Sequence, residues 1–274
     1  MQLDLSGRVV IVTGAARGIG RAIAETFVAE RAVVVGIDLS ADGLGWLDEA
    51  RGAAGLEGAS MACDVTDGAW TRALVRDVVD RFDRIDVLVN NAGVVADGTI
   101  EETSDEDWDR CFDVNVGGTF KMCRAVVPTM KTQRYGRIVN AASFAAIVPS
   151  VGSGAYAASK AAVVQLTRTL AGELGPWGVT ANAYAPGMIP TAMNGFAEMA
   201  GPAQERLLDT LTLRRWGEAQ EVADVVCFLA SDAARYVTGT LLDVSGGKLA
   251  TQLPQKAYEL AEAGAAAAET GQQR

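Results

Sequence analysis

Histidine is the most informative absence in this sequence, because none of its 274 residues is a histidine. This excludes the Ser-His-Asp and Cys-His machinery of nucleophilic enzymes and every zinc site that uses an imidazole ligand. Acid–base chemistry must therefore use tyrosine, lysine, cysteine or a carboxylate. We predict no metal site.

Cysteine and positive charge are also scarce. Four cysteines stand far apart without a C-x-x-C pair, which favours buried thiols in a reducing, cytoplasmic setting. The formal charge of -10 argues against a nucleic-acid partner, which needs a basic surface. No apolar run approaches the roughly 18 residues of a membrane span, and the first residues lack the pattern of a secretory signal. We expect neither a membrane nor a nucleic-acid partner.

What the sequence does contain begins with an apolar run, residues 9–12, that leads into a glycine-rich loop with Gly14, Gly18 and Gly20. Helical periodicity follows the loop. A strand, a glycine loop and a helix are the setting of a dinucleotide phosphate site, because the backbone can approach the pyrophosphate and the helix N-terminus offers free N–H groups. The spacing is G-x-x-x-G-x-G, whereas G-x-G-x-x-G is the commoner pattern.

A second apolar run, residues 33–37, ends in Asp38, eighteen residues after Gly20. A carboxylate at this point hydrogen-bonds the ribose diol of the cofactor and repels a 2′-phosphate, so we predict NAD and not NADP. Arg17 is the counter-argument, because a guanidinium beside this site could bind that phosphate.

Tyr156 and Lys160 stand one helical turn apart at the start of a predicted helix, so they project from the same face. A nearby ammonium group favours the phenolate form of tyrosine and makes the phenol more useful in proton transfer. Ser143 follows the apolar run 137–142, which reads as a strand that delivers a hydroxyl to the carboxyl edge of a sheet. Alone, a Tyr-x-x-x-Lys pattern is weak evidence, since most such pairs lie on ordinary solvated helices.

Two further stretches carry polar residues in unusual places. Residues 85–89 read as a strand that ends in Asn90-Asn91-Ala92-Gly93, which is either a ligand-contacting segment or a simple turn. A helix that begins after Thr103 or Ser104 contains Asn115 followed closely by two glycines. Such a breach of helix propensity marks a functional or strained site, with close helix–helix packing as the alternative.

The rest of the chain alternates apolar strands with helices, which predicts one α/β, doubly wound domain over residues 1–250. The further strands are 59–63, 179–185 and 241–244, and the further helices are 69–82, 156–174 and 221–229. In residues 189–215 the pattern loosens into two short helical pieces, 192–200 and 203–211, which we interpret as a substrate lid, with a plain surface excursion as the alternative. Residues 251–274 read as an Ala/Glu-rich helical extension, either frayed or ordered against another subunit.

Together these features resemble the short-chain dehydrogenase/reductase family, in the branch of 3-oxoacyl reductases and polyol dehydrogenases. The match covers residues 5–248, and the residues that carry it are Thr13, Gly14, Gly18, Gly20, Asn90, Asn91, Ala92, Gly93, Asn115, Ser143, Tyr156, Lys160, Pro186, Gly187, Gly239 and the stretch 228–232. Val244-Ser245-Gly246-Gly247 departs from the commoner Asp-Gly-Gly, and the tail is long. The resemblance implies a seven-stranded parallel sheet of order 3-2-1-4-5-6-7 with helices on both faces, and a homotetramer.

The resemblance also implies a mechanism. Hydride would pass between the nicotinamide and a carbon that bears a hydroxyl or a carbonyl, with Tyr156 as general acid/base. Lys160 would bind the nicotinamide ribose and bias Tyr156 toward phenolate, Ser143 would hold the substrate oxygen, and Asn115 would anchor a water near Lys160. The residues implied to bind the cofactor are Gly14, Arg17, Gly18, Ile19, Gly20, Asp38, Asp64, Val65, Asn90, Ala92, Gly93, Tyr156, Lys160, Pro186, Gly187, Ile189 and Thr191.

We therefore predict a cytoplasmic, NAD-dependent oxidoreductase that interconverts a secondary alcohol and a ketone, with oxidation favoured by the choice of NAD. Mainly apolar segments at 94–98, 145–151 and 188–199 favour a hydrophobic or cyclic substrate. The first alternative is an NADP-dependent ketoreductase of the 3-oxoacyl reductase type. A non-catalytic NAD-binding sensor is a second alternative, although such relatives usually lack one of the four catalytic residues. A dehydratase or epimerase is a third, although those relatives usually carry extra domains.

Overall fold

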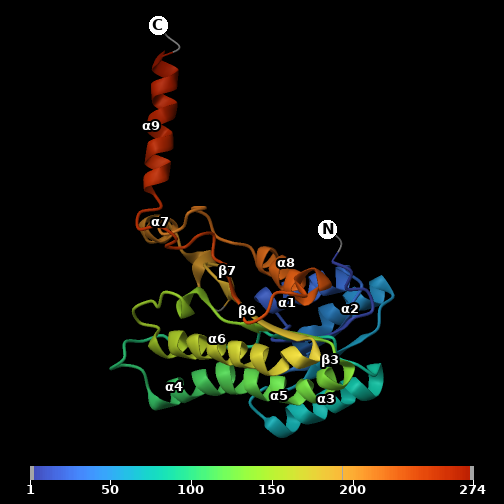
Figure 1. The fold of residues 1–274 in the computed structure, drawn as a ribbon. Coiled ribbons are helices and arrows are strands. Elements are labelled where there is room, and N and C mark those ends of the chain that lie inside the picture. The colour runs from blue at the N-terminus through green and yellow to red at the C-terminus, as the bar shows by residue number, and fades with distance from the viewer. Residues whose placement is uncertain (1–2, 193, 272–274) are drawn as a thin grey trace.

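Seven of the apolar runs form the parallel strands of one twisted sheet (Figure 1). The computed structural model describes residues 3–192 and 194–271. Its strands are β1 (Val9–Thr13), β2 (Val33–Asp38), β3 (Gly58–Ala62), β4 (Val87–Asn90), β5 (Gly136–Ala141), β6 (Val179–Pro186) and β7 (Leu241–Val244). Their order in the sheet is β3-β2-β1-β4-β5-β6-β7, which confirms the predicted topology.

Helices cover both faces of the sheet, as the doubly wound pattern predicts (Figure 1). One face carries α1 (Gly18–Ala29), α2 (Gly45–Ala54) and α8 (Ala219–Ala230), and the other carries α3 (Gly68–Phe82), α5 (Thr119–Gln133) and α6 (Gly154–Leu174). The helix α4 (Asp105–Phe112) lies on the same side as α5 and α6, where Cys111 packs against Ala155 of α6 (Figure 1). Alternate residues of a strand point to opposite faces, so β1 sends Val10 and Val12 into one core and Val9 and Ile11 into the other. These two cores fix the position of the strands and therefore of their carboxyl ends.

The predicted long helix around Asn115 forms, and it changes from α to π geometry in its middle. Ser104 caps α4 by accepting a hydrogen bond from the Asp107 backbone N–H at 3.0 Å. Between α4 and α5 the chain forms one π-helical stretch, Asp113–Gly118, with Asn115 in it. Such π turns inside α-helices often occur at functional sites. Gly118 is required there, because a Cβ atom at that position would lie 2.7 Å from a methyl group of Val65.

The connections between the main elements contain several short 3-10 helices: η1 (Ala41–Leu44), η3 (Phe144–Ala146), η4 (Gly175–Trp177), η5 (Phe196–Glu198) and η6 (Asp232–Ala234). In the predicted lid, the prediction of a helix over residues 192–200 is wrong for the residues that the structure describes there. Asn194 accepts from the backbone of Thr191 and donates to the carbonyl of Ile189, and Gly195 adopts a φ of 60°, so the chain turns and only η5 forms. The second piece, predicted as 203–211, is the helix α7 (Gly201–Leu208).

The last helix of the described residues is α9 (Lys256–Gly271), which projects away from the rest of the molecule beside α7 (Figure 1). The hydroxyl of Tyr258 ties its first turn to the segment predicted as a lid by donating to the carbonyl oxygen of Thr212 at 2.7 Å. Among the helices of residues 3–192 and 194–271, none combines the length and the apolar character that a membrane crossing requires.

Candidate active site

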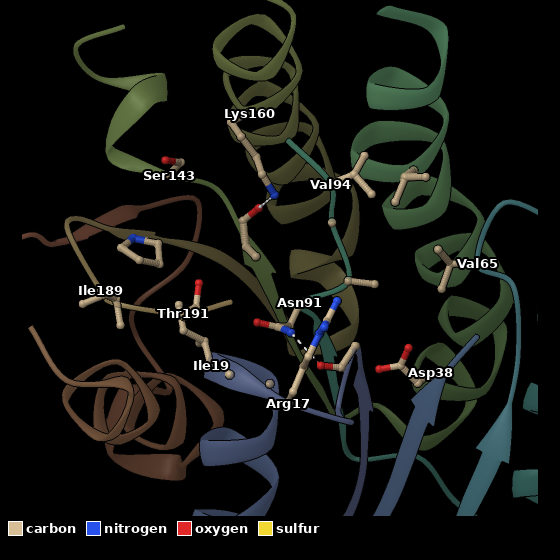
Figure 2. Close-up of a pocket in the computed structure, with 18 of the residues that line it drawn as sticks. Arg17, Ile19, Asp38, Val65, Asn91, Val94, Ser143, Lys160, Ile189 and Thr191 are labelled. Atoms are coloured by element: carbon tan, nitrogen blue, oxygen red, sulfur yellow. Dashed lines mark hydrogen bonds between the residues drawn. The ribbon is translucent and has the colours of Figure 1, made fainter. Parts of the chain in front are cut away.

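A cavity of about 390 Å³ opens at the carboxyl ends of the strands, where open α/β sheets bind ligands. It collects nearly all the residues that the sequence singled out: Gly14, Arg17, Gly18, Ile19, Gly20, Asp38, Asp64, Val65, Ala92, Gly93, Ser143, Tyr156, Lys160, Pro186, Gly187, Ile189 and Thr191. Figure 2 shows Ser143 and Lys160 at one end of this cavity and Asp38 and Val65 at the other. Asn90 and Asn115 do not line it.

The glycine loop between β1 and α1 has no room for side chains at Gly14 and Gly20. A Cβ on Gly20 would lie 2.1 Å from the carbonyl oxygen of Gly14, and one on Gly14 would lie 2.9 Å from the Cα of Ala92. The N-terminus of α1 has no side-chain cap, so its first N–H groups remain available for an anion. The loop therefore fits the pyrophosphate of a dinucleotide.

Asp38 ends β2 beside this loop. One carboxylate oxygen accepts a hydrogen bond from the backbone N–H of Ala16 at 3.0 Å, and the other accepts from Leu39 at 2.9 Å. These bonds fix the carboxylate at the wall of the cavity. A fixed carboxylate in this place suits the two hydroxyls of a ribose.

Tyr156 lies in the first turn of α6 and is half-buried. Burial raises the pKa of its phenol above the usual value, since the charged form loses its hydration, and the hydrogen bond with the Ser143 hydroxyl works in the opposite direction. The Ser143 hydroxyl also accepts from the backbone N–H of Ala145 at 3.1 Å, which fixes its position at the end of β5. The phenol and the serine hydroxyl therefore meet at one point of the cavity.

Lys160 is almost fully buried, and burial lowers the pKa of its ammonium group to about 8. Its Nζ atom donates to the backbone carbonyl oxygen of Ala141 at 2.8 Å (Figure 2). The same atom lies 5.7 Å from the centre of the Tyr156 ring. Lys160 is thus anchored to β5, one turn away from the phenol that it was expected to influence.

Asn115 lies behind Gly93, off the cavity wall. Its Oδ1 atom accepts from the backbone N–H of Val94 at 2.9 Å, and its Nδ2 atom donates to the Val94 carbonyl and to the Ser159 hydroxyl, both at 3.0 Å. A Cβ built on Gly93 would lie 3.0 Å from Asn115 Oδ1 and 3.3 Å from Lys160 Nζ. Asn115 and Lys160 therefore flank the same point, which only glycine leaves open.

Asn90 differs from its predicted place. It is buried, and its side chain donates to Asn140 at 2.8 Å inside the protein. Its neighbour Asn91 lines the cavity instead, where Nδ2 donates to the carbonyl oxygens of Thr13 and Gly14 and Oδ1 accepts from the Tyr184 hydroxyl. The alternation of side chains at the end of β4 is the signal that separates the two asparagines.

Asn91 belongs to the stretch that carries the family resemblance, and Val94, Ala192 and Asn194 lie in the segments 94–98 and 188–199 that were expected to wall the substrate pocket. The cavity residues that sequence reasoning missed are Ile37, Leu39, Cys63, Val114, Ala141, Ala142 and Tyr184. Most lie within one or two residues of a predicted site residue, so the strand ends themselves were the available signal. Cys111 and Ser159 are a further omission, since both contact the Asn115 side chain from inside the helices. Among the residues that the structure describes, no group of three or more metal-binding side chains gathers.

The chain resembles known proteins over most of its length. A family model described as enoyl-(acyl carrier protein) reductase matches residues 14–248. The 3-oxoacyl-[acyl-carrier-protein] reductase FabG of Thermotoga maritima is 42% identical over 247 residues, which are 89% of this chain and 99% of that protein. The enzyme of the same name from Escherichia coli K12 is 36% identical over 245 residues, covering 89% of this chain and 98% of that protein.

Solved structures agree with these sequence relatives. The crystal structure of levodione reductase superposes with a TM-score of 0.85 at 36% identity, covering 90% of this chain and 99% of that one. A putative short-chain alcohol dehydrogenase from Sinorhizobium meliloti 1021 superposes with a TM-score of 0.87 at 34% identity, covering 92% of this chain and all of that one. The chain therefore belongs to the short-chain dehydrogenase/reductase family, as a 3-oxoacyl reductase-like oxidoreductase that uses a nicotinamide cofactor on a small-molecule substrate.

Proposed function

We propose that the protein reduces a ketone to a secondary alcohol, with Tyr156 as the proton donor. The observation that carries this proposal is the meeting of the Tyr156 phenol and the Ser143 hydroxyl in the cavity that also holds the glycine loop. Both sequence relatives named above and the levodione reductase structure are reductases by name, which favours our ketoreductase alternative over the alcohol oxidation that we expected first.

The cofactor, when bound, supplies or accepts the hydride at its nicotinamide ring. The chain's own residues handle the oxygen. Ser143 donates a hydrogen bond to the substrate carbonyl oxygen, and Tyr156 transfers its phenolic proton to that oxygen as the carbon gains hydride. In the reverse direction, the tyrosinate removes the hydroxyl proton.

Lys160 and Asn115 serve this proton transfer from behind the cavity wall. The Nζ atom of Lys160 keeps two further N–H bonds beyond the one to Ala141, and these suit a ribose hydroxyl and a water. Both N–H groups of the Asn115 amide have protein partners, whereas its Oδ1 atom keeps a lone pair beside Gly93. That lone pair supports the predicted water between Asn115 and Lys160.

The choice between NAD and NADP rests on Asp38 and Arg17, which both line the cavity. The fixed carboxylate of Asp38 supports NAD(H), because it would repel a 2′-phosphate at the adenosine ribose. Arg17 and the kinship with 3-oxoacyl reductases support the NADP-dependent alternative. Initial rates with NADH and NADPH against one ketone separate the two.

The substrate that we propose is a small ketone with a hydrophobic body, acyclic or cyclic. Ile147, Val148 and Val151, in the loop after Ser143, have exposed apolar side chains that support this class. Residues 189–215 are the proposed lid over it. Within this segment and its borders Met188, Leu208 and Leu211 form a small apolar cluster of their own, and the rings of Phe196 and Trp216 stack 5.4 Å apart.

The decisive experiment is an initial-rate screen of ketones and secondary alcohols with both cofactors. Faster ketone reduction than alcohol oxidation at neutral pH supports the proposal. Tight cofactor binding with no turnover of any substrate would instead support the sensor alternative. We further propose a cytoplasmic homotetramer, which sedimentation analysis and fractionation of cells that express the protein would test.

A further inference from the structure

Tyr184 is a buried tyrosine on β6 whose hydroxyl is joined to the glycine loop through one intermediate residue. Its side chain is fully enclosed, and it belongs to the same core cluster as Val12 and Ile189. The hydroxyl donates to the Oδ1 atom of Asn91 at 3.0 Å, and both residues line the cavity (Asn91 is labelled in Figure 2). Because the hydroxyl is carried by the ring of a core residue, packing fixes its position.

Asn91 stands between this hydroxyl and the glycine loop. Its backbone N–H donates to the Thr13 hydroxyl at 3.0 Å, which fixes its main chain just after β4. Its Nδ2 atom donates to the carbonyl oxygens of Thr13 at 3.1 Å and of Gly14 at 3.2 Å. A Cβ built on Gly20 would collide with the same Nδ2 atom. The amide therefore contacts both the loop and the first turn of α1, which are the parts that fit the pyrophosphate.

The two ends of the Asn91 amide cannot be exchanged. If the amide turned over, its oxygen would face the carbonyl oxygens of Thr13 and Gly14, and acceptors cannot hydrogen-bond one another. The Oδ1 atom must therefore point away from the loop, where the Tyr184 hydroxyl is its donor. Burial raises the pKa of the Tyr184 phenol, so the hydroxyl keeps the proton that it donates.

We propose that Tyr184 is a positioning residue for the cofactor, because its hydroxyl holds the Asn91 amide against the glycine loop. The inference adds to the proposed function and rests on the nicotinamide cofactor that it places in this cavity. Without the hydroxyl, Asn91 Oδ1 loses its donor and the amide can rotate. Part of the binding free energy of the cofactor then goes into ordering the loop. The competing explanation is that the hydroxyl only satisfies a buried polar group.

The test compares Tyr184→Phe with Tyr135→Phe in the full-length protein. Tyr135 is a matched control, because its hydroxyl also donates to one side chain, that of Asp232 at 3.0 Å, and it does not line the cavity. Titration of NADH and NADPH fluorescence measures Kd for each cofactor. Initial rates at varied cofactor concentration separate the cofactor KM from kcat.

In Tyr184→Phe, Kd and KM for the better-bound cofactor should rise by about 3- to 10-fold, as expected for the loss of one neutral hydrogen bond. At saturating cofactor, kcat should change by less than about twofold, since the loss falls on binding. Tyr135→Phe should leave Kd unaltered. An unchanged Kd in Tyr184→Phe would overturn the proposal, even if the melting temperature falls.

A double-mutant cycle with Asn91→Ala identifies the route of the effect. If the hydroxyl acts through the amide, Tyr184→Phe should weaken cofactor binding in the unaltered background and have little effect once residue 91 is alanine. Equal effects in both backgrounds would overturn the proposal. If Asn91→Ala does not fold, the Kd of Tyr184→Phe against that of Tyr135→Phe still decides.

Cofactor titration keeps this inference apart from the ketoreductase assignment. If Tyr184→Phe binds the cofactor more weakly but the unaltered protein reduces no ketone, the role of Tyr184 is supported and the assignment is contradicted. If the unaltered protein reduces ketones and Tyr184→Phe does so with the same cofactor KM, the assignment stands and the role of Tyr184 is overturned.

Discussion

The Nζ atom of Lys160 lies 2.8 Å from the backbone oxygen of Ala141 and 5.7 Å from the centre of the Tyr156 ring. The ammonium group is therefore held by the sheet and not by the phenol. Burial raises the pKa of Tyr156, so the phenol keeps its proton at neutral pH in the protein alone. A protonated phenol is the form that ketone reduction consumes, which agrees with the reductase direction proposed above.

Replacing Tyr156 with phenylalanine should abolish most turnover and spare cofactor binding. The change removes the proton donor but keeps the ring, so kcat should fall by about 10²- to 10⁴-fold. Initial rates and titration of NADH fluorescence measure the two quantities. Substantial activity in Tyr156→Phe would refute the assignment of this residue.

Replacing Asp38 with alanine should weaken the use of NADH more than that of NADPH. The variant loses hydrogen bonds from the ribose hydroxyls to a charged group, which corresponds to a loss of about 10-fold or more in kcat/KM for NADH. Asp42→Ala is the control, because Asp42 is an exposed acid in the next turn that does not line the cavity. A preference for NADPH in the unaltered protein would show that Arg17 dominates at this site.

Substituting Gly93 with alanine should impair catalysis without unfolding the protein. The added methyl group would occupy the point between Asn115 and Lys160, so one of the two side chains must move by a few tenths of an ångström. Reduced kcat with an unchanged melting temperature is the expected result. Gly172→Ala is the matched control: its Cβ meets no atom within 4 Å, and it should stabilise α6 by up to about 1 kcal/mol. Equal kcat in both variants would contradict the role given to Gly93.

The stability of the cofactor-free protein should depend on pH through Lys160. Burial lowers the pKa of this group in the folded protein from 10.5 to about 8. Between these values the unfolded chain binds a proton that the folded chain does not, so the free energy of unfolding rises with pH across this window. The stabilisation is complete above the unfolded pKa and is lost as pH falls through about 8.

Comparison with Lys160→Met isolates this effect from other titrating groups. Urea unfolding from pH 7 to 11 should show the unaltered protein gaining stability relative to the variant, by a value on the order of 3 kcal/mol. A difference that is constant over this range would mean that the ammonium group is better solvated than its position indicates.

Removing residues 251–274 should leave a folded and active enzyme, as expected if residues 1–250 form the whole dehydrogenase domain. The relatives support this, since 99% of the Thermotoga maritima protein aligns within 89% of this chain. Melting and initial rates of a chain that ends at Ala250 are the test. Because Tyr258 bonds to Thr212 in the proposed lid, a rise in KM is expected and Tyr258→Phe should reproduce part of it. Failure of the shortened chain to fold would disprove the boundary.

Most of the fold could be predicted because parallel strands are buried on both faces and read as unbroken apolar runs, as β1 and β2 do. The helix α2 escaped prediction, since it contains two glycines and buries only Leu47. The helix expected at 192–200 does not form in the described residues because the side chain of Asn194 bonds to the backbone locally. At α2 the helix forms without an apolar periodicity that could announce it, and at 192–200 local hydrogen bonds prevent the helix that the periodicity predicted.

The candidate site was predictable in its members and not in its internal contacts. Residue spacing placed Ser143, Tyr156 and Lys160 at one sheet edge, and the structure brings them to one cavity. The hydrogen bond from Lys160 to the carbonyl oxygen of Ala141 joins residues nineteen apart along the chain, and no sequence pattern predicts it. The burial of Asn90 likewise depends on Asn140, fifty residues away on the next strand.

The π-helical stretch between α4 and α5 has a consequence for how this enzyme could be altered. Each residue of an α-helix advances the side-chain direction by about 100°. The wider π turn therefore rotates the side chains of α5 about the helix axis, relative to the directions they would have in a regular continuation of α4. Deleting one residue from the π-helical stretch would let α4 and α5 join into one regular α-helix, which is the more stable backbone conformation. The amide of Asn115 would then move out of reach of Val94 and Ser159, and the water that we propose between Asn115 and Lys160 would lose its anchor.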